Sequence, residues 1–215
     1  MDNQPISKRQ LLNTLPDEWP QDLRPAINNH IEADRRKIVV LDDDPTGTQT
    51  IHGLHVLTEW STETLTAEFK NDLSAFYILT NSRSCTLPVA RKINAEIGHN
   101  LATAARQVCK KFVIISRSDS TLRGHFPGEV DALSGALTQN YDGWIIIPFF
   151  LEGGRYTIDN IHFVEEDGIL VPAAQTEFAC DRVFGYSKSN LCDWVAEKTN
   201  GKIAAKDVIS ISIED

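Results

Sequence analysis

The sequence lacks the short motifs that identify several large classes of enzyme. It contains no GxxxxGK[ST] phosphate-binding loop, no GxGxxG dinucleotide fingerprint and no GxSxG nucleophile elbow. These absences argue against a nucleotidyl-transferring or NAD-dependent enzyme. They leave the function to be inferred from other clusters of polar residues.

The chain also lacks the usual spacings of metal-binding residues. None of its four cysteines forms a CxxC pair, and their spacings suit no zinc site. We interpret them as reduced packing thiols of a cytoplasmic protein. His52 and His55 are three residues apart, so in a strand they face opposite ways and we expect them to pack. The sequence therefore predicts no metal site.

No stretch approaches the roughly 20 apolar residues of a membrane span. The first residues contain no apolar run, so we expect no signal peptide. The net charge of −9 opposes binding to nucleic acid and to anionic membranes. An anionic ligand would therefore be held by a local cluster of donors.

Short apolar runs alternate with helical patterns between residues 37 and 147. The runs are residues 37–41, 54–57, 76–79, 112–115 and 144–147, and the helical patterns are residues 62–71, 88–110 and 127–138. This alternation predicts an α/β fold, a mostly parallel three-layer sheet with helices on both faces. Ligands of such sheets bind at the carboxyl ends of the strands.

The two ends of the chain have a different texture. Residues 1–36 are expected to be a helical N-terminal extension, with helices at 7–13 and 22–36, and residues 37–215 to be the α/β domain. After Pro148 we expect a β-hairpin around residues 165–168, a helix at 187–198 and a strand at 208–213. A final strand that stops at Asp215 leads us to expect that more chain once followed.

Three adjacent aspartates, Asp42, Asp43 and Asp44, follow the first predicted strand. Adjacent carboxylates repel one another and are costly to bury unpaired. We interpret them as groups that bind a cation, accept hydrogen bonds from a polyol or remove a proton from a hydroxyl. Thr46 and Gly47 add a small donor and a close backbone approach. A capped turn with solvated carboxylates is the alternative.

A second polar cluster, Asn81-Ser82-Arg83-Ser84, follows the third predicted strand. Asn81 and Ser82 can bond hydroxyls, and Arg83 can bind a carboxylate. Alternatively, Ser84 simply caps the next helix.

The polar segment from Ser116 to His125 is the strongest candidate. It carries two arginines, an aspartate, several hydroxyls and a glycine directly before a predicted helix: Arg117, Asp119, Ser120, Thr121, Arg123 and Gly124. The unpaired backbone N–H groups at that helix start would favour an anion. A purely structural Arg–Asp network is the alternative.

A fourth cluster contains Gly153, Gly154 and Arg155. We interpret it as a mobile loop that closes over a ligand, with a plain surface turn as the alternative.

Three of these segments together resemble the four-carbon acid sugar kinases, once a family of unknown function with some members labelled type III effector-like. They are Asp43-Asp44-Pro45-Thr46-Gly47, Asn81-Ser82-Arg83 and Asp119-Ser120-Thr121-Leu122-Arg123-Gly124, in this order. Residues 154–157, the hairpin ending at Pro172 and the stretch from Phe178 to Phe184 also resemble the family. The likeness runs from about Lys37 to Lys198.

The resemblance implies that the chain is the sugar-acid-binding domain of a kinase that phosphorylates tetronates such as erythronate, threonate or 3-oxo-tetronate. A C-terminal nucleotide-binding domain, absent here, would bind ATP and Mg2+. The isolated chain is therefore expected to hold no cofactor, to be inactive as a kinase and to have the sugar acid and that domain as partners. A homodimer is left open.

The resemblance also suggests roles for individual residues. Arg123, together with Arg83, would hold the substrate carboxylate. Asp43, Asp44 and Asp119 would bond its hydroxyls, and one of them would orient or deprotonate the accepting oxygen. Ser82, Ser120 and Thr121 would complete the site.

Two other functions remain open from the sequence. The chain is then either a stand-alone small-molecule-binding or regulatory protein without kinase activity, or a host-directed effector-like interaction protein.

Overall fold

The computed structural model describes residues 4–49, 51–137, 141–213 and 215. The chain divides into two compact units. We call Trp19–Ser118 with Gly124–Asp142 the parallel-sheet unit, and Met1–Glu18 with Asp119–Arg123 and Gly143–Asp215 the antiparallel-sheet unit. Each is described by itself.

The parallel-sheet unit is built on short strands rich in β-branched and aromatic residues. Its strand order is β3-β4-β2-β5, with all pairs parallel. The strands are β2 (Lys37–Asp42), β3 (Val56–Leu57), β4 (Ala75–Leu79) and β5 (Phe112–Arg117). The register pairs Asp42, the last residue of β2, with Leu79 of β4 and Arg117 of β5. Polar residues that follow these strands therefore begin at one edge of the sheet.

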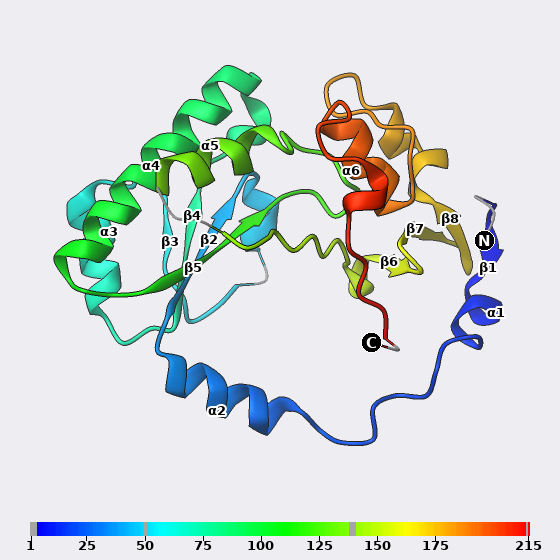
Figure 1. The fold of residues 1–215 in the computed structure, drawn as a ribbon, viewed down its shortest axis with the longest axis horizontal. Helices are drawn as coiled ribbons and strands as arrows, with labels where there is room; N and C mark the ends of the chain where they lie inside the picture. The colour runs from blue at the N-terminus through cyan, green and yellow to red at the C-terminus, as the bar shows by residue number, and fades with distance from the viewer. Residues whose placement is uncertain (1–3, 50, 138–140, 214) are drawn as a thin grey trace. The chain divides into compact units, whose positions relative to one another are not determined.

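The helices of this unit are α2 (Arg24–Asp34), α3 (Thr62–Lys70), α4 (Leu87–Gln107) and α5 (Gly128–Leu137), with short 3-10 turns η1 (Pro45–Thr48) and η2 (Ser82–Ser84). Figure 1 shows α3, α4 and α5 beside the sheet. Alternate strand residues such as Val39 and Phe76 pack against these helices in one core. Val113 and Ile115 point the other way and are 39% and 47% exposed.

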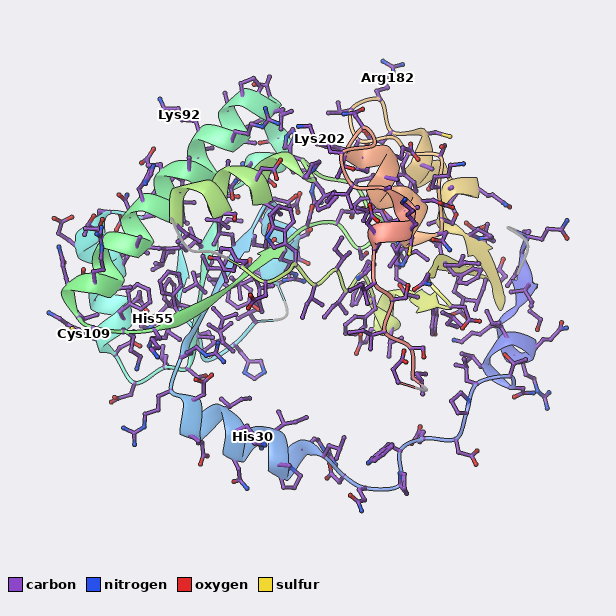
Figure 2. The ribbon with its side chains drawn as sticks, in the orientation of Figure 1. His30, His55, Lys92, Cys109, Arg182 and Lys202 are labelled. Atoms are coloured by element: carbon purple, nitrogen blue, oxygen red, sulfur yellow. The ribbon has the colours of Figure 1, made fainter. Side chains whose placement is uncertain are left out.

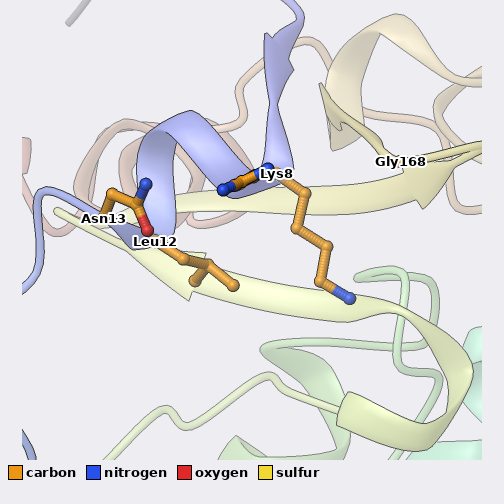
Figure 3. Close-up of a pocket in the computed structure, with 5 residues that line it drawn as sticks. Lys8, Leu12, Asn13 and Gly168 are labelled. Atoms are coloured by element: carbon orange, nitrogen blue, oxygen red, sulfur yellow. The ribbon is translucent and has the colours of Figure 1, made fainter.

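The antiparallel-sheet unit has the strand order β1-β8-β7-β6. Its strands are β1 (Ile6–Ser7), β6 (Arg155–Ile158), β7 (Ile161–Glu166) and β8 (Ile169–Pro172); its helices are α1 (Lys8–Leu12) and α6 (Leu191–Lys198), with 3-10 turns η3 (Leu151–Gly153), η4 (Ala173–Gln175), η5 (Glu177–Cys180) and η6 (Ala205–Asp207). Leu11 fills the centre of its core against Ile158, Ile161, Phe163 and Leu170. Beside it lies an open pocket lined by Lys8, Arg9, Leu12, Asn13 and Gly168, shown in Figure 3.

The predicted α/β class is confirmed, since a parallel sheet is flanked by helices and an antiparallel sheet is added to it. The predicted hairpin is the β7–β8 pair.

Two predicted strands are wrong, because residues 144–147 and 208–213 lie outside any strand. Ile145 and Ile209 are 81% and 89% exposed, so neither run has a sheet to join. Within the described ranges, no helix has both the length and the apolar character that a bilayer crossing needs.

Candidate functional site

The ends of β2, β4 and β5 bring a first polar cluster together in the parallel-sheet unit. Past β4 the chain turns back along the end of β2, where the Thr80 amide donates to the Asp42 carbonyl (2.9 Å) and the Arg83 amide to the Asp43 carbonyl (3.1 Å). This backbone pairing fixes η2 beside the aspartates. The positions of the acidic and basic side chains thus follow from the parallel register.

Asp43 is the centre of this first cluster, and its side chain is only 3% exposed. Arg83 donates to both of its oxygens, from Nε at 3.1 Å and from Nη2 at 2.5 Å. Ser118 Oγ donates a further bond of 2.6 Å. A bidentate guanidinium and a hydroxyl compensate a buried carboxylate well. Asp43 is therefore held in one orientation before any ligand arrives.

Asp42 is buried behind this pair and is held by Arg117, whose Nη1 donates to Asp42 Oδ2 at 3.2 Å and also to the Gly47 carbonyl. Burial raises the pKa of the Asp42 carboxyl, and the Arg117 charge opposes that rise. A Cβ on Gly47 would lie 2.1 Å from Asp42 Oδ2. The close backbone approach that we predicted at Gly47 is therefore an approach to the Asp42 side chain.

Asp44 is the most accessible of the three aspartates, with 27% of its side chain exposed. Its Oδ1 accepts from the Thr46 amide at 2.8 Å, which caps η1, and from the Thr46 hydroxyl. Arg83 Nη1 lies 3.6 Å from Asp44 Oδ2. Asp44 therefore shares the Arg83 charge with Asp43 and still faces solvent.

Ser84 does not cap the next helix, as one interpretation of the sequence had it. Its hydroxyl donates to the Asn81 carbonyl at 2.8 Å, so it closes η2. Helix α4 is capped by Thr86 without a side-chain hydrogen bond. Asn81 adopts the left-handed conformation with φ of 52°, which turns the chain sharply after β4.

Glu129 is a buried carboxylate next to this cluster that the sequence reasoning missed. It lies in the first turn of α5, is 5% exposed and accepts from Asn94 Nδ2 at 3.2 Å. Nearby, Ser82 Oγ lies 2.8 Å from the Thr80 hydroxyl. Burial, and then the Asp43 charge, raise the pKa of Glu129. An acidic residue in a first helical turn usually faces solvent, so no sequence signal marked it.

The segment Asp119–Arg123 forms a second cluster, in the antiparallel-sheet unit. Arg123 donates to both oxygens of Asp119, from Nε at 2.8 Å and from Nη2 at 3.2 Å. The Thr121 amide donates to Asp119 Oδ2 at 3.1 Å. Asp181 Oδ2 lies 4.0 Å from Arg123 Nη1. Arg123 is therefore tied to acidic side chains of its own unit.

Two buried side chains hold the backbone of this segment. His162 is fully buried and its Nε2 donates to the Ser120 carbonyl at 2.8 Å, while Nδ1 lies 2.9 Å from Thr157 Oγ1. Burial lowers the pKa of His162. Tyr186 donates from its hydroxyl to the Thr121 carbonyl at 2.7 Å, and burial raises its pKa. Neither residue stood next to a recognised motif.

An aromatic ring links two arginines of the second cluster. The Arg123 and Arg155 guanidinium carbons lie 5.0 and 5.3 Å from the centre of the Phe178 ring. These are ordinary distances for cation–π contacts.

The predicted site residues thus divide between the two units. The parallel-sheet unit holds Asp43, Asp44, Thr46, Gly47, Asn81, Ser82, Arg83, Arg117 and Gly124; the antiparallel-sheet unit holds Asp119, Ser120, Thr121, Arg123 and Arg155. Within the described part of the chain, no group of three histidine, cysteine or acidic side chains is arranged to hold a metal ion.

Comparison with known proteins shows which family the chain belongs to. Residues 38–213 match the model of the sugar-binding N-terminal domain family. A Bordetella bronchiseptica protein described as a domain of unknown function (DUF1537) has a similar structure, with a TM-score of 0.57 and 21% identity over 74% of this chain and 39% of that one. A Haemophilus influenzae protein that is also described as DUF1537 has a TM-score of 0.53 and 18% identity over 74% of this chain and 38% of that one. The chain thus spans about two fifths of those relatives, and no curated protein matches it. The family model covers most of the chain, which therefore belongs to the family of sugar-binding N-terminal domains.

Proposed function

We propose that this chain is the substrate-binding domain of an ATP-dependent kinase for four-carbon sugar acids, tetronates such as erythronate, threonate or 3-oxo-tetronate. The observation that carries the proposal is the Asp43–Arg83–Ser118 arrangement at the strand ends of a sugar-binding domain. The resemblance of the same segments to the four-carbon acid sugar kinases supports it. The Bordetella relative is described with bound citrate, itself a hydroxy acid, which also favours an acidic ligand.

The geometry suggests how hydroxyl groups would be recognised. A carboxylate accepts several hydrogen bonds, and Asp43 is already oriented by Arg83 and Ser118. Asp44 is more exposed and close to the same guanidinium, so it is the better placed of the two to accept a proton from a substrate hydroxyl.

ATP and Mg2+ are not assigned to residues of this chain. The sequence has no phosphate loop, and the buried Asp42 and Asp43 are already paired with arginines. We therefore propose that ATP and Mg2+ are bound mainly by a further domain, which phosphoryl transfer would need. The four free thiols agree with a cytoplasmic location.

The relative described as a domain-swapped dimer makes a homodimer a reasonable proposal for this chain too. Sedimentation velocity over a range of protein concentrations would test it, and a monomer at every concentration would count against it.

Isothermal titration of the chain with erythronate, threonate and 3-oxo-tetronate tests the main proposal. We expect at least one acid to bind, and the Asp44→Asn variant to bind it roughly tenfold more weakly, since a charged hydrogen-bond acceptor is lost. Asp142→Asn, which changes an exposed aspartate, is the matched control and should bind like the parent. Absence of binding by all three acids would refute the proposal.

A further inference from the structure

Helices α3, α4 and α5 all pack against the same face of the parallel sheet, where they share one core with Val39 and Phe76. On the opposite face, the outer strands present exposed apolar side chains. Val113 and Ile115 of β5 are 39% and 47% exposed, and Val56 of β3 is 39% exposed. Parallel sheets normally have both faces buried. This second face therefore needs an apolar covering layer.

Helix α2 belongs to the same unit and carries an apolar stripe that is open to solvent. None of its side chains is buried. Leu23, Ile27 and Ile31 recur every four residues, so they lie along one side of the helix, and they are 46%, 51% and 46% exposed. Figure 2 shows the side chains of this helix standing out from the ribbon, with His30 labelled. A stripe of this kind is typical of a helix that packs against a core.

The sequence of α2 provides little local stabilisation for a helix. Its N-cap, Leu23, makes no side-chain hydrogen bond, its first turn has no acidic residue and its last turn has no basic residue. Capping groups and such charges are what stabilise an isolated helix from within. With 11 residues, α2 is also shorter than the helices that persist alone in water. Its stability therefore depends on packing against another element.

The connection to β2 places a suitable surface within reach. Only Arg35 and Arg36 lie between the end of α2 and the start of β2. Arg35 adopts the left-handed conformation with φ of 52°, which ends the helix sharply. Connections this short are common between a helix and the strand that follows it in α/β units, where the helix lies over the sheet. A change of backbone angles at these two residues is enough to bring α2 over the sheet.

The spacing of the side chains on α2 matches that on β5. Four residues of a helix rise about 6 Å, and two residues of a strand rise about 6.6 Å. The separation of Ile27 and Ile31 along the helix is thus close to that of Val113 and Ile115 along the strand. Because α2 leads into β2, which is parallel to β5, the helix would run antiparallel to both strands.

We propose that α2 folds over the second face of the parallel sheet as a strap, with Ile31 against Val113 and Ile27 against Ile115. The start of the helix then points towards the strand ends that carry the first polar cluster. Helix α2 lies outside residues 38–213, which match the family model, so the strap is an addition to the family fold. The inference does not depend on the proposed function.

Hydrogen exchange of the α2 amides gives the first test. We expect these amides in the parent chain to exchange at least about tenfold more slowly than in an unstructured peptide, and Ile27→Asp to abolish that protection. Asn29→Asp is the matched control, because it adds the same charged side chain on the opposite, exposed side of the helix and should keep the protection. Unprotected amides in the parent, or equal protection in the two variants, would overturn the proposal.

A double-mutant cycle tests the contact itself. If Ile27 and Ile115 touch, the fall in Tm of the double alanine variant should be smaller than the sum of the two single falls. Ile27→Ala combined with Val56→Ala, on the far edge strand, is the control and should be additive. Additive effects for Ile27 and Ile115 would contradict the proposal. Coupling that appears only at concentrations where sedimentation shows a dimer would overturn it too, since the helix of a second copy would then cover the face.

Discussion

At the scale of single residues, the structure shows how adjacent aspartates are tolerated in a protein interior. Asp42 and Asp43 each receive an arginine from a neighbouring strand end, and Asp44 caps its own turn. The sequence predicted which loops carry these groups, because strand ends are visible in the apolar pattern. It could not predict the pairing, since Asp42–Arg117 and Asp43–Arg83 join residues far apart in the chain.

Gly124 is the residue on which the Ser118–Asp43 contact depends. Its φ is +146°, and a Cβ would lie 2.1 Å from Ser118 Oγ and 3.4 Å from Asp43 Oδ2. Gly124→Ala should displace Ser118, weaken tetronate binding and lower the free energy of unfolding by about 1–3 kcal/mol. Chemical denaturation and titration measure both effects. Gly135→Ala, in an exposed helical position with open space, should instead stabilise the chain by up to about 1 kcal/mol. If Gly124→Ala and Gly135→Ala changed stability and binding alike, the Ser118–Asp43 contact would not depend on Gly124.

The contribution of Glu129 to the free energy of unfolding should depend on pH. Its pKa is raised in the folded chain, so the folded state holds this proton more tightly than the unfolded chain does. The stability of the parent relative to Glu129→Gln should therefore be greatest near or below the ordinary value of 4.5 and fall as the pH rises above it. At neutral pH the glutamine variant should be as stable as the parent or more stable, by on the order of 1 kcal/mol. Urea unfolding between pH 4 and 8 measures this difference.

The matched control for Glu129 is Glu63→Gln, which changes an exposed glutamate in the first turn of another helix. Its stability relative to the parent should stay nearly constant over the same pH range. A difference for Glu129→Gln that does not change with pH would show that this carboxyl is not the group responsible.

At the scale of elements, helices and buried strands followed the sequence pattern more closely than isolated apolar runs did. The long predicted helix at 88–110 appears as α4, because its apolar face and its early proline are both clear local signals. The runs at 144–147 and 208–213 have strand composition but no neighbouring strand. Strand formation requires hydrogen bonds from another segment, which a local pattern cannot reveal. The short strand β1 was missed for the same reason, as its identity comes from pairing with β8.

The segment around Leu11 was expected to be part of an extension, yet it completes a core. Leu11 is 1% exposed among the apolar residues of the antiparallel sheet. Leu11→Ala should therefore lower the free energy of unfolding by about 2–5 kcal/mol, as is usual for a large-to-small change in a core. Thermal and denaturant unfolding measure it. Leu23→Ala, at a leucine that is 46% exposed, should cost far less. Equal costs would mean that α1 is not held against this sheet.

At the scale of the whole molecule, each unit has its own hydrophobic core. The cluster around Phe76 belongs to the parallel-sheet unit, and the cluster around Leu170 to the antiparallel-sheet unit. The sequence indicated a single α/β domain after residue 36, because local patterns show elements but not which elements share a core. The predicted site residues accordingly divide between the two units, with Asp43 and Arg83 in one and Asp119 and Arg123 in the other.

The C-terminal run, residues 208–213, presents exposed apolar side chains that can mediate association between chains. Ile209, Ile211 and Ile213 alternate with polar residues and are 89%, 81% and 70% exposed. An exposed apolar stripe with the period of a strand favours pairing with another chain. Changing all three to serine should therefore lower self-association in sedimentation experiments and leave tetronate affinity unchanged. Val183→Ser removes an isolated apolar side chain that is 72% exposed and should have little effect. If the triple variant associates as strongly as the parent, this run does not mediate contact between chains.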